Sequence, residues 1–301
     1  MKINDIKNDE DILVIGGSEW KPDESDNDSQ DNIKDRKWKT ISIILATILV
    51  LGVCSFIGKH ILYNSQFPKS RPDKEIIRLL DNTMEGTPGI KPSTTESMGV
   101  KLKIYALSGL KASFADTVPD YNDPSVYFIT RSADYKIEND KRVMIGDFVQ
   151  NGEILSKSRW RAGFMAVSHD GNAQIGISRS DKVRRHILKE NGSFFRQMAI
   201  VAAGTRCDKQ YILKGKVTRC AYACDEAGKL YFIETAYPET LYGFADALIE
   251  YGFIDAVYVT GGIQPDLFYR DSNGTAHGCY VDDKPHKLIV WTKQGDDISC
   301  K

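Results

Sequence analysis

The chain has 301 residues, of which 42% are hydrophobic and 27% are charged, enough apolar material for at least one core. This composition excludes a collagen-like chain, a wholly disordered chain and a small disulfide-stabilised protein. The 40 basic and 41 acidic side chains nearly cancel. We therefore expect no nucleic-acid partner, because proteins that bind nucleic acid usually carry a basic face.

Residues 1–39 form a polar tail with eleven acidic and seven basic side chains. Such a segment buries too little apolar surface to offset the entropy lost on ordering, so we expect it to be disordered. Its one apolar stretch, residues 12–15, is either a transient strand or a short motif that binds a cytoplasmic partner.

Residues 40–58 contain nineteen residues without a charge, and a helix of that length crosses most of the about 30 Å hydrocarbon core of a lipid bilayer. Four basic residues lie within positions 34–39, whereas Lys59 is the only lysine or arginine in the ten residues that follow. This asymmetry predicts a single-pass anchor with a cytoplasmic amino terminus and an extracytoplasmic remainder. A cleaved signal peptide and a buried core helix are the alternatives, but the leader is long and no small-residue cleavage site follows.

Residues 59–98 are rich in proline, glycine and serine, which predicts a stalk around one short amphipathic helix at residues 73–82. We place the folded domain at residues 99–301, a normal size for a single domain. Five cysteines follow the apolar stretch, so their number is odd. Cys220 and Cys224 share one face of a predicted strand but lie too far apart to form a disulfide with each other. Each is therefore either a buried free thiol or bonded to a cysteine on a different element.

The first half of the domain alternates apolar and polar residues, as is typical of β-strands. Asn151-Gly152 and Asp170-Gly171 provide hairpin turns, because these pairs accept positive φ angles. A helix is expected at residues 181–190, with Ser180 as its N-cap. The expected strands are 101–107, 126–130, 142–149, 152–158, 162–167, 173–178 and 198–203.

The second half changes to a helical repeat. Strands at 217–224 and 229–235 form a hairpin, and the second strand leads through a helix at 239–251 to an apolar strand at 254–259. The last three elements predict a βαβ unit with parallel strands. Thr260, Gly261 and Gly262 then follow the carboxyl end of a strand, where α/β sheets place ligands and where glycine amides can approach an anion.

Two arginines lie in apolar surroundings, where an unpaired guanidinium is expensive. Arg196 follows two phenylalanines, and Arg219 lies in the predicted strand 217–224. Each therefore needs an anionic partner, either a structural carboxylate or a bound phosphate. The histidines show no HxH or HExxH spacing, so we expect neither a metal nor a cofactor.

Four segments keep a recognisable order and spacing: FMAVSHDGNAQIGIS, RQMAIVAAG, VTRCAYACDEAGKLYFIE and GFADALIEYGFIDAVYVTGG. Together, residues 140–275 resemble the phosphodiester glycosidase family, which includes many bacterial exported proteins. The resemblance implies an α+β domain with a mixed sheet, a pocket between the Arg219 strand and the Gly-Gly turn, and activity on glycosyl phosphodiesters or envelope glycans.

The sequence departs from the family pattern where catalysis is expected. Thr260 replaces the family's aspartate, so Asp266 is our candidate for the missing carboxylate, and neutral threonine can serve neither as acid nor as base. The alternative is a catalytically inactive relative that binds an envelope glycan or a protein partner. The expected substrate-binding residues are Arg196, Arg219, Thr260, Gly261 and Gly262.

Overall fold

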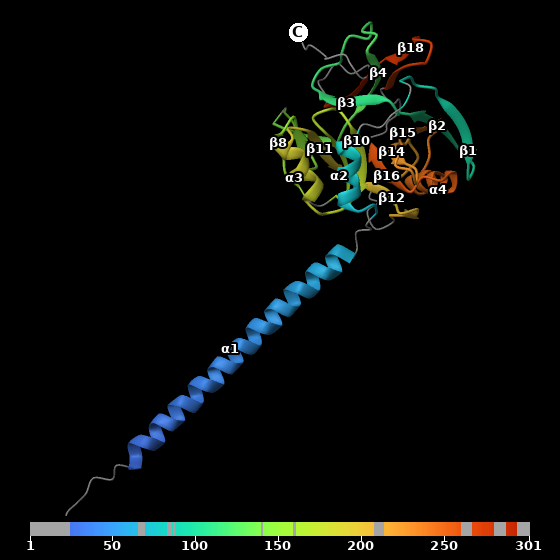
Figure 1. The fold of residues 1–301 in the computed structure, drawn as a ribbon. Coiled ribbons are helices and arrows are strands. Elements are labelled where there is room, and N and C mark those ends of the chain that lie inside the picture. Colours follow the sequence, from blue (N-terminus) through green and yellow to red (C-terminus); the bar gives the residue numbers. More distant parts are fainter. Residues whose placement is uncertain are drawn as a thin grey trace, which may run out of the picture. The chain divides into compact units, whose positions relative to one another are not determined.

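The computed structural model describes residues 25–65, 70–82, 86, 88–139, 141–158, 161–207, 214–259, 267–279 and 287–293. The chain divides into two compact units, Met1–Ile61 and Leu62–Lys301. The first contains most of one long helix, and the second contains all the strands that the structure describes (Figure 1).

The long helix α1 (Ser25–Ser65) has 41 residues. Its stretch Asp35–Leu62 is long and apolar enough to cross a membrane, and none of its apolar window is buried. At 1.5 Å per residue, these 28 residues extend about 42 Å. The helix already includes residues 25–39, which we expected to be disordered, because a helix that has nucleated in an apolar segment extends at little cost into adjoining residues. Residues 1–24 lie outside the described residues.

The largest sheet, here called the large sheet, has seven strands in the order β1-β2-β15-β14-β16-β12-β13. It brings together strands from both ends of the folded unit. Its strands are β1 (Ser93–Ser97), β2 (Val100–Ala106), β15 (Leu230–Thr235), β14 (Cys220–Cys224), β16 (Asp255–Val259), β12 (Ala199–Ala202) and β13 (Thr205–Arg206).

Two five-stranded sheets and one two-stranded sheet complete the described β-structure. The β9 sheet contains β10 (Ala173–Ile177), β9 (Gly163–Val167), β11 (Ser193–Gln197), β7 (Phe148–Gln150) and β8 (Glu153–Ser156). The β4 sheet contains β18 (Ala276–Cys279), β17 (Leu267–Arg270), β4 (Val126–Arg131), β19 (Leu288–Lys293) and β3 (Leu110–Ala115). The small sheet pairs β5 (Tyr135–Glu138) with β6 (Lys141–Met144).

One face of each of the three larger sheets contributes to a shared central core. That core joins Tyr222 of the large sheet, Phe195 of the β9 sheet and Trp291 of the β4 sheet. The outer face of the large sheet packs against α4 (Leu241–Tyr251). The outer face of the β9 sheet packs against helices α2 (Asp73–Asp81) and α3 (Lys182–Lys189).

The hairpin turns predicted from the sequence are confirmed. Asn151 and Gly152 have φ angles of 48° and 81° between β7 and β8, and Gly171 has a φ of 79° between β9 and β10. These left-handed conformations are the ones that asparagine and glycine adopt most readily. The hairpin of β14 and β15 is also present, with Gly228 at a φ of 82°.

The helix ends follow local capping rules, with one difference from expectation. The Thr240 hydroxyl accepts a hydrogen bond from the Gly243 amide at 3.0 Å, and Gly252 ends α4 in the left-handed region with a φ of 110°. Asp181, rather than Ser180, occupies the N-cap of α3 (Lys182–Lys189). The Ser180 hydroxyl instead accepts from the Lys182 amide at 3.1 Å, one residue outside the cap.

The two strands of the predicted βαβ unit are not neighbours. β15 and β16 each pair with β14 in antiparallel register, so they share a direction but are separated by that strand. The prediction placed β16 directly beside β15. In the structure, β14 occupies that position, because it forms a hairpin with β15. In the described part of the chain every pairing between named strands is antiparallel, which corrects the expected mixed sheet.

The segment expected to form a stalk contributes to the core. Helix α2 lies beside α3 (Figure 1). Ile76 and Leu80 are fully buried against Val183 and Ile187. Amphipathic spacing had predicted the helix, but a free stalk helix would expose these two side chains to water. The β9 sheet, whose strands lie about a hundred residues further along the chain, covers them instead.

Strand β1 also precedes the expected domain start at Gly99. It pairs with β2 at the edge of the large sheet, and the Ser97 hydroxyl donates to the Ala247 carbonyl of α4 at 2.9 Å. The folded structure therefore begins near Ser70, whose amide donates to the Ile177 carbonyl at 3.4 Å.

Candidate functional site

A row of four residues crosses the large sheet at one end of its central strands. Lys103 pairs with Glu234, Glu234 with Cys220, and Cys220 with Val259. We call these four residues the Glu234 row. Because neighbouring strands lie about 4.8 Å apart, Glu234 is about 10 Å from Val259, the residue that precedes the predicted Thr260-Gly261-Gly262 turn.

Glu234 is a buried carboxylate in this row, with only 3% of its surface exposed. Its Oε1 atom accepts hydrogen bonds from Lys103 Nζ at 2.9 Å and from Tyr105 Oη at 3.0 Å. Its Oε2 atom is also buried and has no hydrogen-bond partner among the described residues. A buried carboxylate oxygen without a donor costs about 1–3 kcal/mol or more, so this atom is the best placed in the row to meet a ligand.

Two neighbours of Glu234, the Tyr105 hydroxyl and the Cys220 thiol, remain protonated. Burial, followed by the charge of Glu234 and the hydrogen bond to it, raises the pKa of Tyr105 well above its ordinary value. Burial and then the charge of Glu234 likewise raise the pKa of the Cys220 thiol far above its ordinary range. Tyr105 therefore acts as a hydrogen-bond donor, and Cys220 does not form the thiolate that a nucleophilic cysteine needs.

A line of aromatic rings connects this row to a histidine. Tyr105 contacts Tyr269 with 5.4 Å between ring centroids, and Tyr269 stacks on His277 at 4.6 Å. Asp271 Oδ2 lies 3.0 Å from His277 Nε2, and this hydrogen bond contributes most to lowering the pKa of Asp271. An oriented and partly exposed imidazole thus lies two ring contacts away from Tyr105.

Arg219 lies at the same end of the large sheet but on its opposite face. Its guanidinium donates to the carbonyls of Glu239 at 2.9 Å and Gly215 at 2.7 Å, and lies 3.5 Å from Tyr258 Oη. Tyr258 belongs to the cluster under α4, whereas Cys220, the next residue after Arg219, belongs to the central core. Side chains alternate along a strand, so Arg219 and Glu234 point to opposite faces.

Arg196 has the structural partner that we considered as one alternative. It is fully buried in β11, with Nε 3.7 Å from Asp147 Oδ2 and Nη2 3.6 Å from Asp181 Oδ1. It also donates to the carbonyls of Ser178 and Ser180 at 2.5 and 2.8 Å. Its partners include none of those that contact Arg219, so the described structure does not bring the two arginines together at one cavity.

Four other expected site residues, Thr260, Gly261, Gly262 and Asp266, lie outside the described residues. Asp255, at the other end of β16, is fully buried and accepts from the Ala203 amide at 3.1 Å. Burial raises its pKa, against the opposing effect of a hydrogen bond from Ser70. It serves the docking of the chain near Ser70 and lies away from the Glu234 row.

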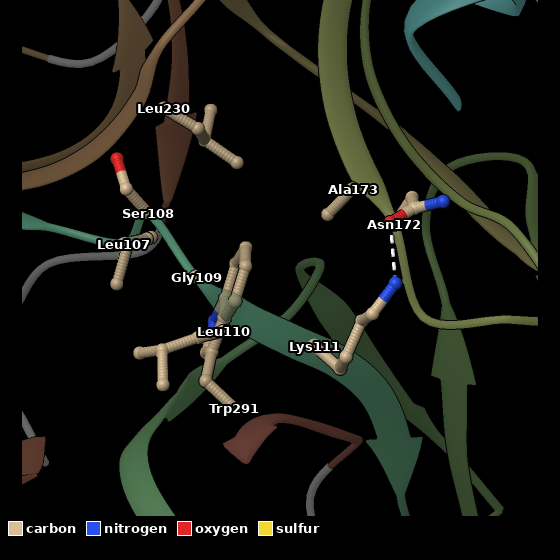
Figure 2. A pocket seen from close by; sticks show the side chains of 9 residues that line it. All are labelled: Leu107, Ser108, Gly109, Leu110, Lys111, Asn172, Ala173, Leu230 and Trp291. Carbon is tan, nitrogen blue, oxygen red and sulfur yellow. Dashed lines mark hydrogen bonds between the residues drawn. The ribbon is translucent and has the colours of Figure 1, made fainter. Parts of the chain in front are cut away.

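A small cavity lies at the opposite end of β2 and β15. Lys111 and Asn172 face each other across its rim, with Nζ 2.6 Å from Oδ1, and Trp291 and Leu230 contribute to the wall (Figure 2). Burial lowers the pKa of Lys111. The cavity measures about 20 Å³, room for about one water molecule, so it is too small for a sugar.

The folded unit is thus an α+β domain with antiparallel sheets around one core and a buried acid at a strand end. It is similar to the catalytic domain of zebrafish N-acetylglucosamine-1-phosphodiester alpha-N-acetylglucosaminidase, auto-inhibited by its pro-peptide. The TM-score is 0.50 at 10% sequence identity, over 71% of this chain and 86% of the zebrafish chain.

A hypothetical protein from Synechocystis matches with a TM-score of 0.41 at 9% identity, over 68% of this chain and 64% of that one. No protein-family model matches the chain, and no curated protein matches it. The likeness to the zebrafish domain supports the fold that the sequence resemblance implied and says nothing further of activity.

Sequence reasoning missed Glu234, although a signal for it was present. The strand 229–235 places this charge among apolar residues, where alternation predicts an inward side chain. The argument from burial that selects Arg196 and Arg219 applies equally to this acid on the neighbouring strand. The partners Lys103 and Tyr105 come from β2, about 130 residues earlier, and this pairing is not visible in the local pattern.

Proposed function

We propose that this protein is a membrane-anchored hydrolase of glycosyl phosphodiesters in which Glu234 supplies the reacting carboxylate. The observation that carries the proposal is the buried Oε2 atom of Glu234, which has no hydrogen-bond partner among the described residues and lies two strands from the end of β16. The fold shared with a phosphodiester glycosidase supports the substrate class.

The chemistry of this substrate class suits a site with one described carboxylate. Glycosidases that expel an alcohol need a second carboxyl group to protonate the leaving oxygen. A glycosyl phosphodiester expels a phosphate monoester, whose oxygen holds its last proton with a pKa of only about 6 and so leaves without an acid. Glu234 then needs only to take a proton from the water that attacks the sugar, or to attack the sugar itself and form a glycosyl ester that a water molecule cleaves in a second step. Replacement of the family's aspartate by Thr260 therefore does not exclude hydrolysis.

Neighbouring groups give the anionic substrate its position in this proposal. The Lys103 ammonium is 45% exposed and donates to Glu234, so it reaches both the carboxylate and the solvent from which a phosphate would approach. Thr260, Gly261 and Gly262 are proposed to offer backbone amides to the phosphate, because they follow directly after β16. Arg219 is proposed to hold two backbone segments in place, the one before β14 through the Gly215 carbonyl and the one before α4 through the Glu239 carbonyl.

The second candidate function is binding of a glycan or protein partner without turnover. One observation favours it: the Glu234 row contains a single carboxylate, whereas most glycosidases use two.

For both candidate functions, the apolar helix is proposed to anchor the protein in a membrane, with the N-terminal tail in the cytoplasm and the folded unit outside the cytoplasm. Residues 12–15 are then available to a cytoplasmic partner.

The test is sugar release by the full-length protein in detergent. Methyl esters of hexose 1-phosphates and N-acetylhexosamine 1-phosphates would be incubated with it, and free sugar and methyl phosphate would be measured. The proposal predicts equal amounts of both products. Saturable binding of these diesters by a folded protein that releases no sugar would instead establish the second candidate.

A further inference from the structure

Three potential metal ligands converge at the surface between α2 and α3, away from the Glu234 row. Asp81 ends α2, while His186 and Glu190 lie one helical turn apart on α3 and just after it. Asp81 Oδ1 is 2.9 Å and Glu190 Oε1 is 3.4 Å from the same atom, His186 Nε2. The ligand atoms of all three residues lie within 4.8 Å of one another.

Hydrogen bonding alone satisfies this arrangement poorly. One imidazole nitrogen carries at most one proton and can direct it at one acceptor, yet two carboxylate oxygens approach Nε2. A metal ion in place of that proton would bind the nitrogen and both oxygens together. In a tetrahedral zinc site with bonds of about 2.0–2.1 Å, adjacent ligand atoms lie about 3.4 Å apart, close to the two separations found here.

The two helices hold these ligands on a rigid support. Ile76 and Leu80 of α2 are fully buried with Val183 and Ile187 of α3 in one apolar cluster. The end of α2 is held further by Asn172, whose amide donates to the Leu80 carbonyl at 2.9 Å. Asp81 therefore cannot move far from His186 unless α2 leaves the sheet.

We propose that Asp81, His186 and Glu190 form a binding site for one divalent transition-metal ion, with zinc the best match. Two carboxylates and a neutral imidazole balance its charge, and a solvent molecule completes a four-coordinate shell. The ion cross-links α2, the first folded element after the apolar helix, to α3 on the β9 sheet. It has a structural effect here and takes no part in the proposed hydrolysis.

The test uses the full-length protein in detergent after removal of metals with a chelator. Titration with zinc, followed by calorimetry and by thermal unfolding, should show one equivalent bound and a higher unfolding temperature. Cobalt(II) in place of zinc should give the visible bands of nitrogen and oxygen ligands without a thiolate charge-transfer band, which excludes binding by cysteines.

Variants separate this site from adventitious binding. Glu190→Gln leaves the shape of an exposed side chain unchanged and should weaken zinc binding at least about tenfold, as should His186→Ala. His277→Ala is the matched control, because His277 also contacts one carboxylate, Asp271, but belongs to no three-ligand group among the described residues; it should bind zinc like the unaltered protein. Unchanged affinity in folded Glu190→Gln, or a thiolate band with cobalt, would overturn the proposal.

Discussion

At the scale of single residues, buried charged side chains differ in whether their hydrogen-bonding atoms have partners within the domain. Arg219 directs its donors at two carbonyls and a phenol. The charge of Arg196 is compensated by Asp147 and Asp181, although its buried Nε atom lies 3.7 Å from Asp147 Oδ2 and makes no hydrogen bond with any described residue. Glu234 keeps one buried oxygen without a described donor. A charge whose partners are complete stabilises a fold, whereas one that lacks a partner indicates a site for something else.

Cys224 gives this scale a pH-dependent prediction. Burial, followed by the charge of Asp255, raises the pKa of its thiol from 9.0 to about 12. The unfolded chain therefore loses this proton first as the pH rises, and the folded state loses stability between pH 9 and pH 12. Urea unfolding across this range should show a shallower decline in Cys224→Ala, by up to about 1.4 kcal/mol per pH unit.

The control for that experiment is Val257→Ala, which truncates a buried side chain of the central core that also contains Cys224 but removes no ionisable group. Its unfolding free energy should follow the same pH dependence as the unaltered protein. Equal slopes in all three proteins would show that Cys224 ionises in the folded state as it does in the unfolded chain.

At the scale of elements, α2 is where sequence and structure differ most. Its periodicity predicted the helix correctly, but the proline and glycine residues around it suggested a stalk. The structure packs it so closely on β10 that a side chain at Gly176 would collide with Ile76 and Phe164. The helix is thus part of the folded unit and fixes where that unit begins.

Truncation of Ile76 tests this placement. Ile76→Ala should lower the free energy of unfolding by about 2–5 kcal/mol, because it leaves a cavity between α2 and the β9 sheet. Chemical denaturation followed by tryptophan fluorescence measures this loss. Lys74→Ala, at an exposed position of the same helix, should change the free energy of unfolding by less than about 0.5 kcal/mol. A similarly small effect of Ile76→Ala would contradict the packing of α2 in the folded unit and support a stalk.

Local elements could be predicted because their signals are local. Asn151-Gly152 requires a tight hairpin, and Thr240 and Gly252 limit α4 by their own caps. The neighbours of a strand depend on residues far along the chain. The insertion of β14 between β15 and β16 follows from its hairpin, yet periodicity did not exclude a direct parallel pair.

The candidate site was predictable only in part, for the same reason. The sequence drew attention to the end of strand 254–259, and Glu234 lies at that end of the large sheet. The sequence did not indicate which face of the large sheet carries the site. Arg219 was assigned to the pocket from its sequence neighbours, whereas alternation places it under α4, opposite the acid.

At the scale of the whole molecule, a long apolar helix precedes a folded unit with its own core. A single membrane-spanning helix and a signal sequence share these properties of length and composition. The four basic residues before the apolar stretch favour an anchor whose amino terminus stays in the cytoplasm.

Membrane extraction distinguishes an anchor from a cleaved signal. The full chain, expressed with tags at both ends, should stay in the membrane pellet after washing with alkaline carbonate and should keep both tags. Protease added outside sealed cells should remove the C-terminal tag and leave the N-terminal one. Release of a shorter soluble protein that lacks the N-terminal tag would identify a cleaved signal.

The rate of sugar release by Glu234→Gln is the most direct measurement of the proposed function. We predict a kcat at least about 100-fold below that of the unaltered full-length protein on the same glycosyl phosphodiester, with an unchanged near-ultraviolet circular dichroism spectrum. Lys111→Ala, in the small cavity at the other end of β2, should remain within about twofold of the unaltered rate. A folded Glu234→Gln protein that releases sugar at the unaltered rate would contradict the assignment of this carboxylate.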